Sequence, residues 1–159
     1  MSGGTPKGKA RVESEIERNR EEGNWNRCLE LSQQLSSDQT QLVQFLMGEA
    51  KLEKFLESGK DSNTSVLLMD AKRHLNTCLN SAGASPLAMD TNLLLSKAHY
   101  VAAEYALALR CIDISGIEPV TRMEKTLPLR VMKLVAESFA VKGMSLEKEY
   151  PDDKNDEGI

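Results

Sequence analysis

The sequence predicts an all-α fold, a short solenoid of about seven antiparallel helices. Apolar residues recur at helical spacing between residues 10 and 149, and Gly-, Pro- and Ser-rich turns separate the segments. Hydrophobic residues make up 40% of the chain but aromatic residues only 4%, which indicates the aliphatic, alanine-rich core of stacked helices. We therefore predict a helical-repeat domain over residues 10–149, a disordered segment at 1–9 and a polar acidic tail at 150–159.

The first four helices follow from periodicity and turn residues. Val12 and Ile16 are spaced by four, and Gly23–Asn24 ends the helix that contains them. Trp25 begins the second helix, where we expect it to pack against Ile16 or the third helix. Ser37–Asp38 caps the third helix, and a polar loop precedes the fourth. The expected helices are 10–22, 25–35, 38–56 and 65–81.

The last three helices are bounded by stronger breaks. Gly83 to Pro86 separates the fourth helix from the fifth, and Ser115–Gly116 with Pro119 ends the sixth. Pro128 suits the first turn of the last helix, because its missing N–H is not needed there. One extra turn is expected at 121–125. The expected helices are 86–102, 104–114 and 128–149.

The segment KAHYVAAEYALALRCI, residues 97–112, resembles the second half of a tetratricopeptide unit. A tight turn is expected at Ala102–Ala103–Glu104, Tyr105 opens the following helix, and Ala108 follows three residues later. Small residues recur where the two helices must approach closely. A pair of this kind buries one surface against its neighbours and leaves another for a partner, which favours a binding scaffold over a catalyst.

Four longer segments resemble the N-terminal region of the tetratricopeptide repeat protein 7 family. They are VESEIERNREEGNWNRCLELSQQL, LMGEAKLEKFLE, LLLSKAHYVAAEYALALRCIDISGIEP and LPLRVMKLVAESFAVKGMSLEK, in the family's order and spacing. The resemblance covers roughly residues 10–148. It departs at Ala102–Ala103, where a polar or glycine-containing turn is expected, and in the loop 57–64. Because family members are several times longer, we expect the chain to be an N-terminal fragment.

This resemblance implies a non-catalytic scaffold. The family helps recruit and stabilise phosphatidylinositol 4-kinase type III alpha at the plasma membrane, together with a hyccin-type subunit and a lipid-anchored membrane protein. It implies a cytoplasmic protein that is recruited peripherally to that membrane. The sequence contains neither a P-loop nor a kinase glycine loop, so no enzymatic activity and no cofactor are expected. The alternative is a generic tetratricopeptide adaptor that binds an extended peptide motif.

Composition excludes several other classes of function. The net charge is −4 and the isoelectric point is about 5.3, so a basic footprint for nucleic acid is absent. The longest apolar runs, such as 66–69, are too short for membrane insertion. Cys28, Cys78 and Cys111 are an odd, dispersed set, which favours a reducing compartment over a disulfide framework.

The tetratricopeptide template places a partner groove along first helices. In the central unit it selects Leu93, Lys97, Tyr100 and Val101, and in the last helix Lys133, Glu137, Ala140 and Val141. The asparagine-rich carboxylate clamp of chaperone-binding repeats is missing, which argues against binding of a chaperone tail. No residue set is expected to be catalytic, to bind a cofactor or to hold a metal.

Other conspicuous residues have simpler interpretations. His74 and Cys78 are spaced by four, as in half of a metal site, but without a second pair we expect them to be packing residues. His99 is expected to face the core with one nitrogen bonded. The charged residues of the first helix, Glu13 to Glu22 including Arg20, are expected to form a solvated face. No helix follows Glu149, so apolar residues of the last helix should be exposed and allow self-association; they are Val131, Met132, Leu134, Val135, Phe139 and Met144.

Overall fold

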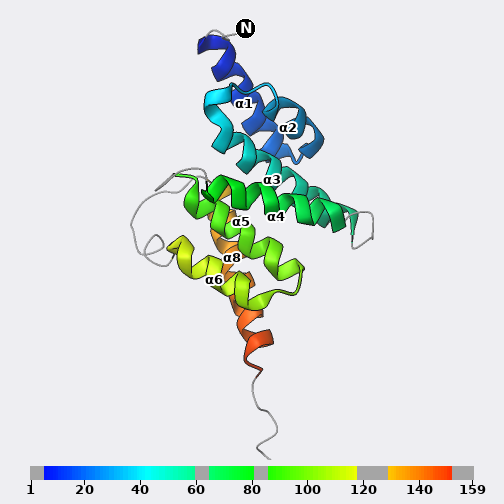
Figure 1. Ribbon diagram of the computed structural model, residues 1–159, viewed down its shortest axis with the longest axis vertical. Coiled ribbons are helices and arrows are strands. Elements are labelled where there is room, and N and C mark those ends of the chain that lie inside the picture. The colour runs from blue at the N-terminus through cyan, green and yellow to red at the C-terminus, as the bar shows by residue number, and fades with distance from the viewer. Residues whose placement is uncertain (1–5, 60–64, 81–85, 118–128, 152–159) are drawn as a thin grey trace, which may run out of the picture. The chain divides into compact units, whose positions relative to one another are not determined.

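The computed structural model describes residues 6–59, 65–80, 86–117 and 129–151, and every regular element in these ranges is a helix (Figure 1). The predicted all-α fold is confirmed. The chain divides into two compact units, residues 1–91 and 92–159. The elements are α1 Pro6–Glu22, α2 Trp25–Ser32, the 3-10 turn η1 Ser37–Gln39, α3 Thr40–Ser58, α4 Ser65–Asn80, α5 Ala88–Val101, α6 Tyr105–Ser115 and α8 Leu129–Glu149.

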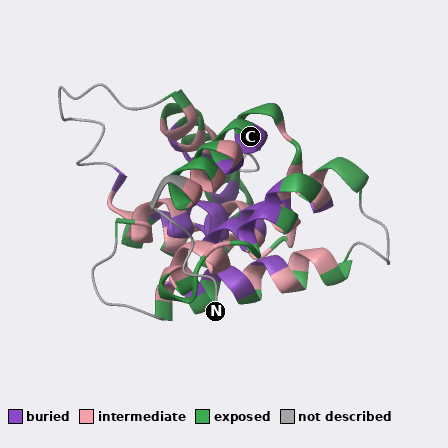
Figure 2. Cartoon of the chain, turned by 90° about the horizontal axis from the view of Figure 1, so that it is seen from above, coloured by how far each residue is buried: buried purple, intermediate pink, exposed green. Residues whose placement is uncertain are grey.

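In the first unit each helix packs on the next one along the chain: α1 on α2, α2 on α3 and α3 on α4. Buried residues recur along one side of the individual helices (Figure 2). The pair α3–α4 packs tightly at Gly48, where an added Cβ would lie 2.7 Å from the Leu75 side chain and 3.3 Å from the Ala71 carbonyl oxygen. The core of this unit is aliphatic with one fully buried aromatic ring, and includes Ile16, Leu31, Phe45, Leu52, Ala71 and Leu75.

In the second unit α5, α6 and α8 are in mutual contact. The rings of Tyr100 and Tyr105 lie 5.7 Å apart and join α5 to α6. The α6 helix packs on α8, and Lys97 of α5 reaches Glu137 of α8. Among the buried residues are Leu95, Ala98, Ala108, Ile112, Val135 and Val141.

The turn between α1 and α2 has the same geometry as the turn between α5 and α6. Gly23 has φ 75° and Ala103 has φ 61°, both in the left-handed region. The N–H of Asn24 donates to the Asn19 carbonyl at 2.9 Å, and the N–H of Glu104 donates to that of His99 at 2.8 Å. These are the bonds of a helix C-terminus closed by a left-handed residue. The predicted turn at residues 102–104 is therefore confirmed, with alanine accepting a backbone conformation that normally favours glycine.

The helix bounds differ from the prediction by more than two residues in two places. The α1 helix begins at Pro6, so residues 6–9 are helical and were wrongly assigned to a disordered segment. Proline is favoured in a first helical turn, and that signal was overlooked. The α2 helix ends at Ser32, not residue 35. The Ser32 hydroxyl donates to the carbonyl of Leu29. The N–H groups of Gln34 and Leu35 donate to the carbonyls three residues earlier, which forms tight turns in place of a further α-helical turn. The predicted extra turn at 121–125 and most of the acidic tail lie outside the described residues.

Arg20 corrects the expectation that the charged side chains of the first helix are all solvated. Arg20 is only 6% exposed, and its guanidinium binds both carboxylate oxygens of Glu49 on α3 at 2.5 and 2.7 Å. Its remaining nitrogen donates to Glu17 at 2.7 Å, and the guanidinium lies over the Phe45 ring. A bidentate pair of this kind offsets the cost of burying the charge.

Candidate protein-interaction surface

Two of the predicted groove residues, Lys97 of α5 and Lys133 of α8, meet at Glu137. Lys97 Nζ lies 3.2 Å from Glu137 Oε2, and Lys133 Nζ lies 4.0 Å from Glu137 Oε1. The Tyr100 hydroxyl donates to Met144 Sδ at 3.3 Å. Leu93 is fully buried, so its assignment to an open groove is wrong. The other predicted residues are half-buried Val101, exposed Ala140 and buried Val141.

The two lysines at Glu137 differ in exposure. The side chain of Lys97 is 18% exposed, whereas that of Lys133 is 76% exposed, and both face the same carboxylate. An exposed ion pair contributes at most about 1 kcal/mol. The pair of Lys133 with Glu137 therefore contributes little to stability. Arg130 and Lys142 of the same helix also have electrostatic or hydrogen-bond partners.

A second recess lies between α6 and α8, with a volume of about 350 Å³. Its walls combine apolar side chains with both signs of charge. The lining residues are Ala106, Leu109, Arg110, Asp113, Lys142, Leu146, Glu149 and Tyr150. Sequence reasoning missed this recess, because it depends on how α6 lies against α8.

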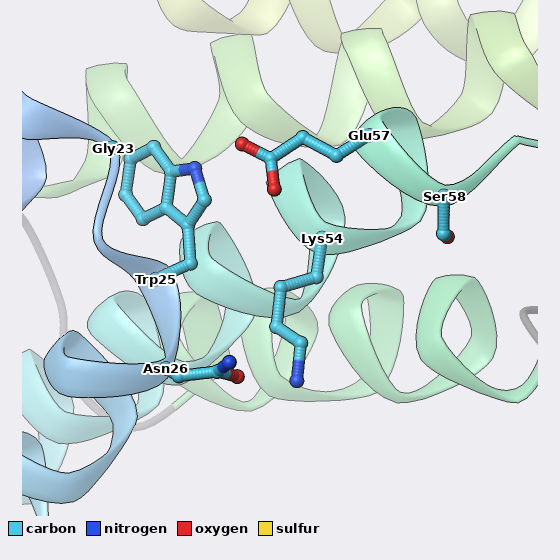
Figure 3. Close-up of a pocket in the computed structure, with 6 residues that line it drawn as sticks. All are labelled: Gly23, Trp25, Asn26, Lys54, Glu57 and Ser58. Atoms are coloured by element: carbon cyan, nitrogen blue, oxygen red, sulfur yellow. The ribbon is translucent and has the colours of Figure 1, made fainter.

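A third recess, of about 310 Å³, lies beside Trp25 in the first unit (Figure 3). The half-buried indole from the start of α2 shares it with Lys54, Glu57 and Ser58 from the end of α3. Trp25 thus lies beside the third helix, one of its two predicted neighbours. Its remaining exposure makes it a surface side chain as well as a packing residue.

His74 is bonded within the first unit. Lys51 Nζ donates to His74 Nε2 at 3.0 Å, and His74 Nδ1 donates to Gln44 Oε1 at 2.7 Å. Burial lowers the pKa of His74 below its usual 6.5, and the nearby charges of Lys51 and Arg73 lower it further. Both contacts suit a neutral imidazole that joins α4 to α3.

Cys78 and His99 are also engaged in packing. Cys78 Sγ is buried 3.5 Å from Thr91 Oγ1. His99 Nδ1 lies 3.2 Å from Glu104 Oε1, so the half-buried imidazole bridges the turn into α6. In the described part of the chain, no three His, Cys, Asp or Glu side chains are grouped closely enough to hold a metal.

The three cysteines are free thiols, two of them buried and Cys111 half-buried. Burial raises the pKa of Cys28 to about 11, with a further contribution from the charge of Glu49. Burial also raises the pKa of Cys78 and Cys111. All three are therefore protonated near neutral pH.

Comparison with known proteins decides the family. The family model "Tetratricopeptide repeat protein 7 N-terminal" matches residues 1–154. The chain belongs to the tetratricopeptide repeat protein 7 family. It is 32% identical to tetratricopeptide repeat protein 7B of Homo sapiens over 91% of this chain, and 32% identical to protein 7A of Homo sapiens over 87% of this chain. Protein 7B of Mus musculus is also 32% identical over 91% of this chain.

The chain spans only 18% to 20% of the length of these tetratricopeptide repeat 7 relatives. Membership in the family identifies a helical protein of the tetratricopeptide-repeat type. None of the helices within the described ranges is long and apolar enough to cross a membrane.

Proposed function

We propose that this chain is part of a non-catalytic scaffold that helps recruit and stabilise a phosphatidylinositol 4-kinase at the plasma membrane. The proposed partners are phosphatidylinositol 4-kinase type III alpha, a hyccin-type subunit and a lipid-anchored membrane protein. The observation that carries the proposal is the family match over residues 1–154. The proposed location is cytoplasmic, with peripheral recruitment to that membrane.

The α5–α8 groove supplies a chemical basis for protein binding. Lys97 and Lys133 present two cationic groups at the carboxylate of Glu137, and the Tyr100 hydroxyl bonds to Met144 on the same helix. These groups recognise carboxylates and backbone carbonyls, and they lie on helices whose packing fixes their positions. Charged groups of this kind contribute to partner choice and association rate more than to total affinity.

Depletion and rescue in cells test the scaffold proposal. Removing the protein should reduce the plasma-membrane fraction of the kinase, and wild-type protein should restore it. A Lys97→Glu/Lys133→Glu variant reverses both groove charges, while Lys148→Glu changes one exposed charge elsewhere on α8 and serves as the control. Kinase that stays at the membrane after depletion would refute the scaffold role.

Capture of an extended peptide is the second candidate function, and the lysines of the groove favour an acidic one. Purified protein should then bind a library of acidic peptides, and the double charge reversal should abolish that binding. Binding only to a folded partner, with no competition from peptides, would exclude this alternative and support the scaffold.

A further inference from the structure

The recess beside Trp25 brings together polar groups that the fold itself does not use. Its walls come from the turn between α1 and α2, from the start of α2 and from the last turn of α3. Within the described residues, no hydrogen bond or ion pair engages the Trp25 indole N–H, the Lys54 ammonium or the Glu57 carboxylate. A concave site with an aromatic wall and a few convergent polar groups has the usual form of a binding site.

The turn that carries the indole is held in one conformation. Gly23 has φ 75°, and the N–H of Asn24 donates to the Asn19 carbonyl at 2.9 Å. The Asn24 side chain also bonds to Asn19 and to Glu22. An added Cβ at Gly23 would lie 3.9 Å from the indole Nε1, so a larger residue there would contact the nitrogen edge of the ring. Because α2 packs on α3, the indole and the end of α3 are already positioned before a ligand binds.

The arrangement of the charged groups favours a cationic ligand. Figure 3 shows the Glu57 carboxylate turned toward the indole, whereas Lys54 extends away from that carboxylate. The face of an indole attracts a cation, and a carboxylate beside it supplies the opposite charge. Arg27 of the same helix is already bonded to Glu30 and Glu15, each at 3.0 Å. The chain therefore does not fill the recess with this arginine.

The first unit contains a filled site of the same chemistry. The Arg20 guanidinium lies 5.3 Å from the centroid of the Phe45 ring and bonds to the carboxylates of Glu49 and Glu17. A guanidinium suits such a site better than an ammonium, because it is planar, less strongly hydrated and able to bond a carboxylate through two N–H groups. Arginine is therefore the cation that fits best between an aromatic ring and a carboxylate.

We propose that the Trp25 recess binds an arginine side chain of a protein partner, with the guanidinium against the indole and paired with Glu57. The recess lies at the ends of α2 and α3, which are already packed on each other, and not along the open face of a helix. In helical solenoids each repeat packs only on its neighbours, and the helices that follow α2 in sequence, α3 and α4, are present in this unit. The inference does not depend on the proposed kinase complex.

The single tryptophan makes this recess directly observable, because Trp25 gives the one indole N–H signal in a proton–nitrogen correlation spectrum. The probe is the peptide acetyl-Gly-Arg-Gly-amide, titrated at low and constant ionic strength. An exposed ion pair with a cation–π contact predicts a dissociation constant on the order of millimolar or weaker. The indole signal should shift saturably. The same peptide with citrulline, which has the shape of arginine without its charge, should leave the signal in place.

Two single charge changes should act in opposite directions on this affinity. Glu57→Gln removes the carboxylate that pairs with the guanidinium and should weaken binding about fivefold, the effect of one exposed ion pair. Lys54→Gln removes a neighbouring like charge and should strengthen binding about twofold. Glu147→Gln makes the matched change at an exposed position of the second unit and should leave the affinity unchanged. Far-UV circular dichroism of all three variants should match the parent.

Three outcomes would overturn the proposal. The first is the lack of a saturable indole shift with the arginine peptide, or an equal shift with the citrulline peptide. The second is equal affinity in Glu57→Gln and Glu147→Gln. The third is a saturable shift with acetyl-Gly-Asp-Gly-amide in place of the arginine peptide, abolished by Lys54→Gln. That result would make the recess a site for carboxylates.

Discussion

The guanidinium of Arg20 shows how one side chain connects two helices of the first unit, α1 and α3. Burial disfavours its charge, but the hydrogen bonds and charge of Glu49, with those of Glu17, outweigh that effect and raise the pKa of Arg20 above its ordinary value. Glu17 belongs to the same helix, Glu49 belongs to α3, and Asn24 at the start of α2 bonds to the neighbouring Asn19. The charge network thus fixes the position of α1 on α3.

A double-mutant cycle should separate the cost of burial from the gain of pairing. Arg20→Met should lower the free energy of unfolding by about 3–5 kcal/mol, because it leaves the buried Glu49 carboxylate without its ion-pair partner. Glu49→Leu alone should cost less, because Arg20 keeps its ion pair with Glu17. The double variant should lose much less, since neither charge remains. Urea denaturation followed by Trp25 fluorescence measures all four proteins. Additive losses would show that the pair is not coupled.

His74 should make stability depend on pH. Its pKa is lower in the folded chain than its usual 6.5, so the unfolded chain binds the proton more tightly. The resulting stability is fully present above about pH 6.5 and is lost as the pH falls through the folded pKa. His74→Gln can still donate to Gln44 and accept from Lys51. The free energy of unfolding of this variant, relative to the parent, should therefore improve as the pH is lowered from 7.5 to 5. A constant difference would contradict this.

At the scale of the element, the two glycines of α3 and α8 should respond oppositely to the same change. Gly48→Ala places a Cβ 2.7 Å from Leu75 and should destabilise the chain by roughly 1–3 kcal/mol. Gly143→Ala meets no neighbour and should stabilise α8 by about 0.5–1 kcal/mol, the usual gain in a helix interior. Thermal unfolding followed by circular dichroism compares both with the parent. Stabilisation by Gly48→Ala would show that α4 does not pack closely there.

Helix positions were predictable from sequence because apolar periodicity and Gly or Pro breaks mark each element independently. Which side chains of different helices contact each other could not be predicted in this way. The burial of Arg20 required knowing that Glu49 faces it from 29 residues away. The burial of Leu93 required knowing which side of α5 is covered. The repeat template predicted that Lys97 and Glu137 line the same groove, but it did not predict that the two side chains form an ion pair.

For the molecule as a whole, the division into two units predicts separable unfolding. Trp25 is the single tryptophan of the sequence and reports the first unit, whereas far-UV circular dichroism reports all helices. In repeat proteins each segment depends mainly on its neighbours. Arg20→Met should therefore move the fluorescence midpoint to lower urea concentration while the dichroism transition broadens. Coincident transitions in this variant would show that the chain unfolds as one unit.

The function predicted from the sequence was taken from the family resemblance, and the comparisons confirm membership in that family. Composition and periodicity alone led only to a helical binding scaffold. Two features appeared only with the tertiary structure. The recess between α6 and α8 depends on the packing of helices that are not adjacent in sequence. The covered face of α3 depends on the register between α3 and α4.

The raised pKa values of Cys28, Cys78 and Cys111 have a practical consequence for spectroscopy. Maleimides react with thiolates, so the three native thiols should label slowly near neutral pH. A cysteine introduced at the exposed Ala136 should react much faster in the otherwise unaltered sequence. A fluorophore attached there would lie on the same side of α8 as Gly143, and its emission would report on the solvent exposure of that side.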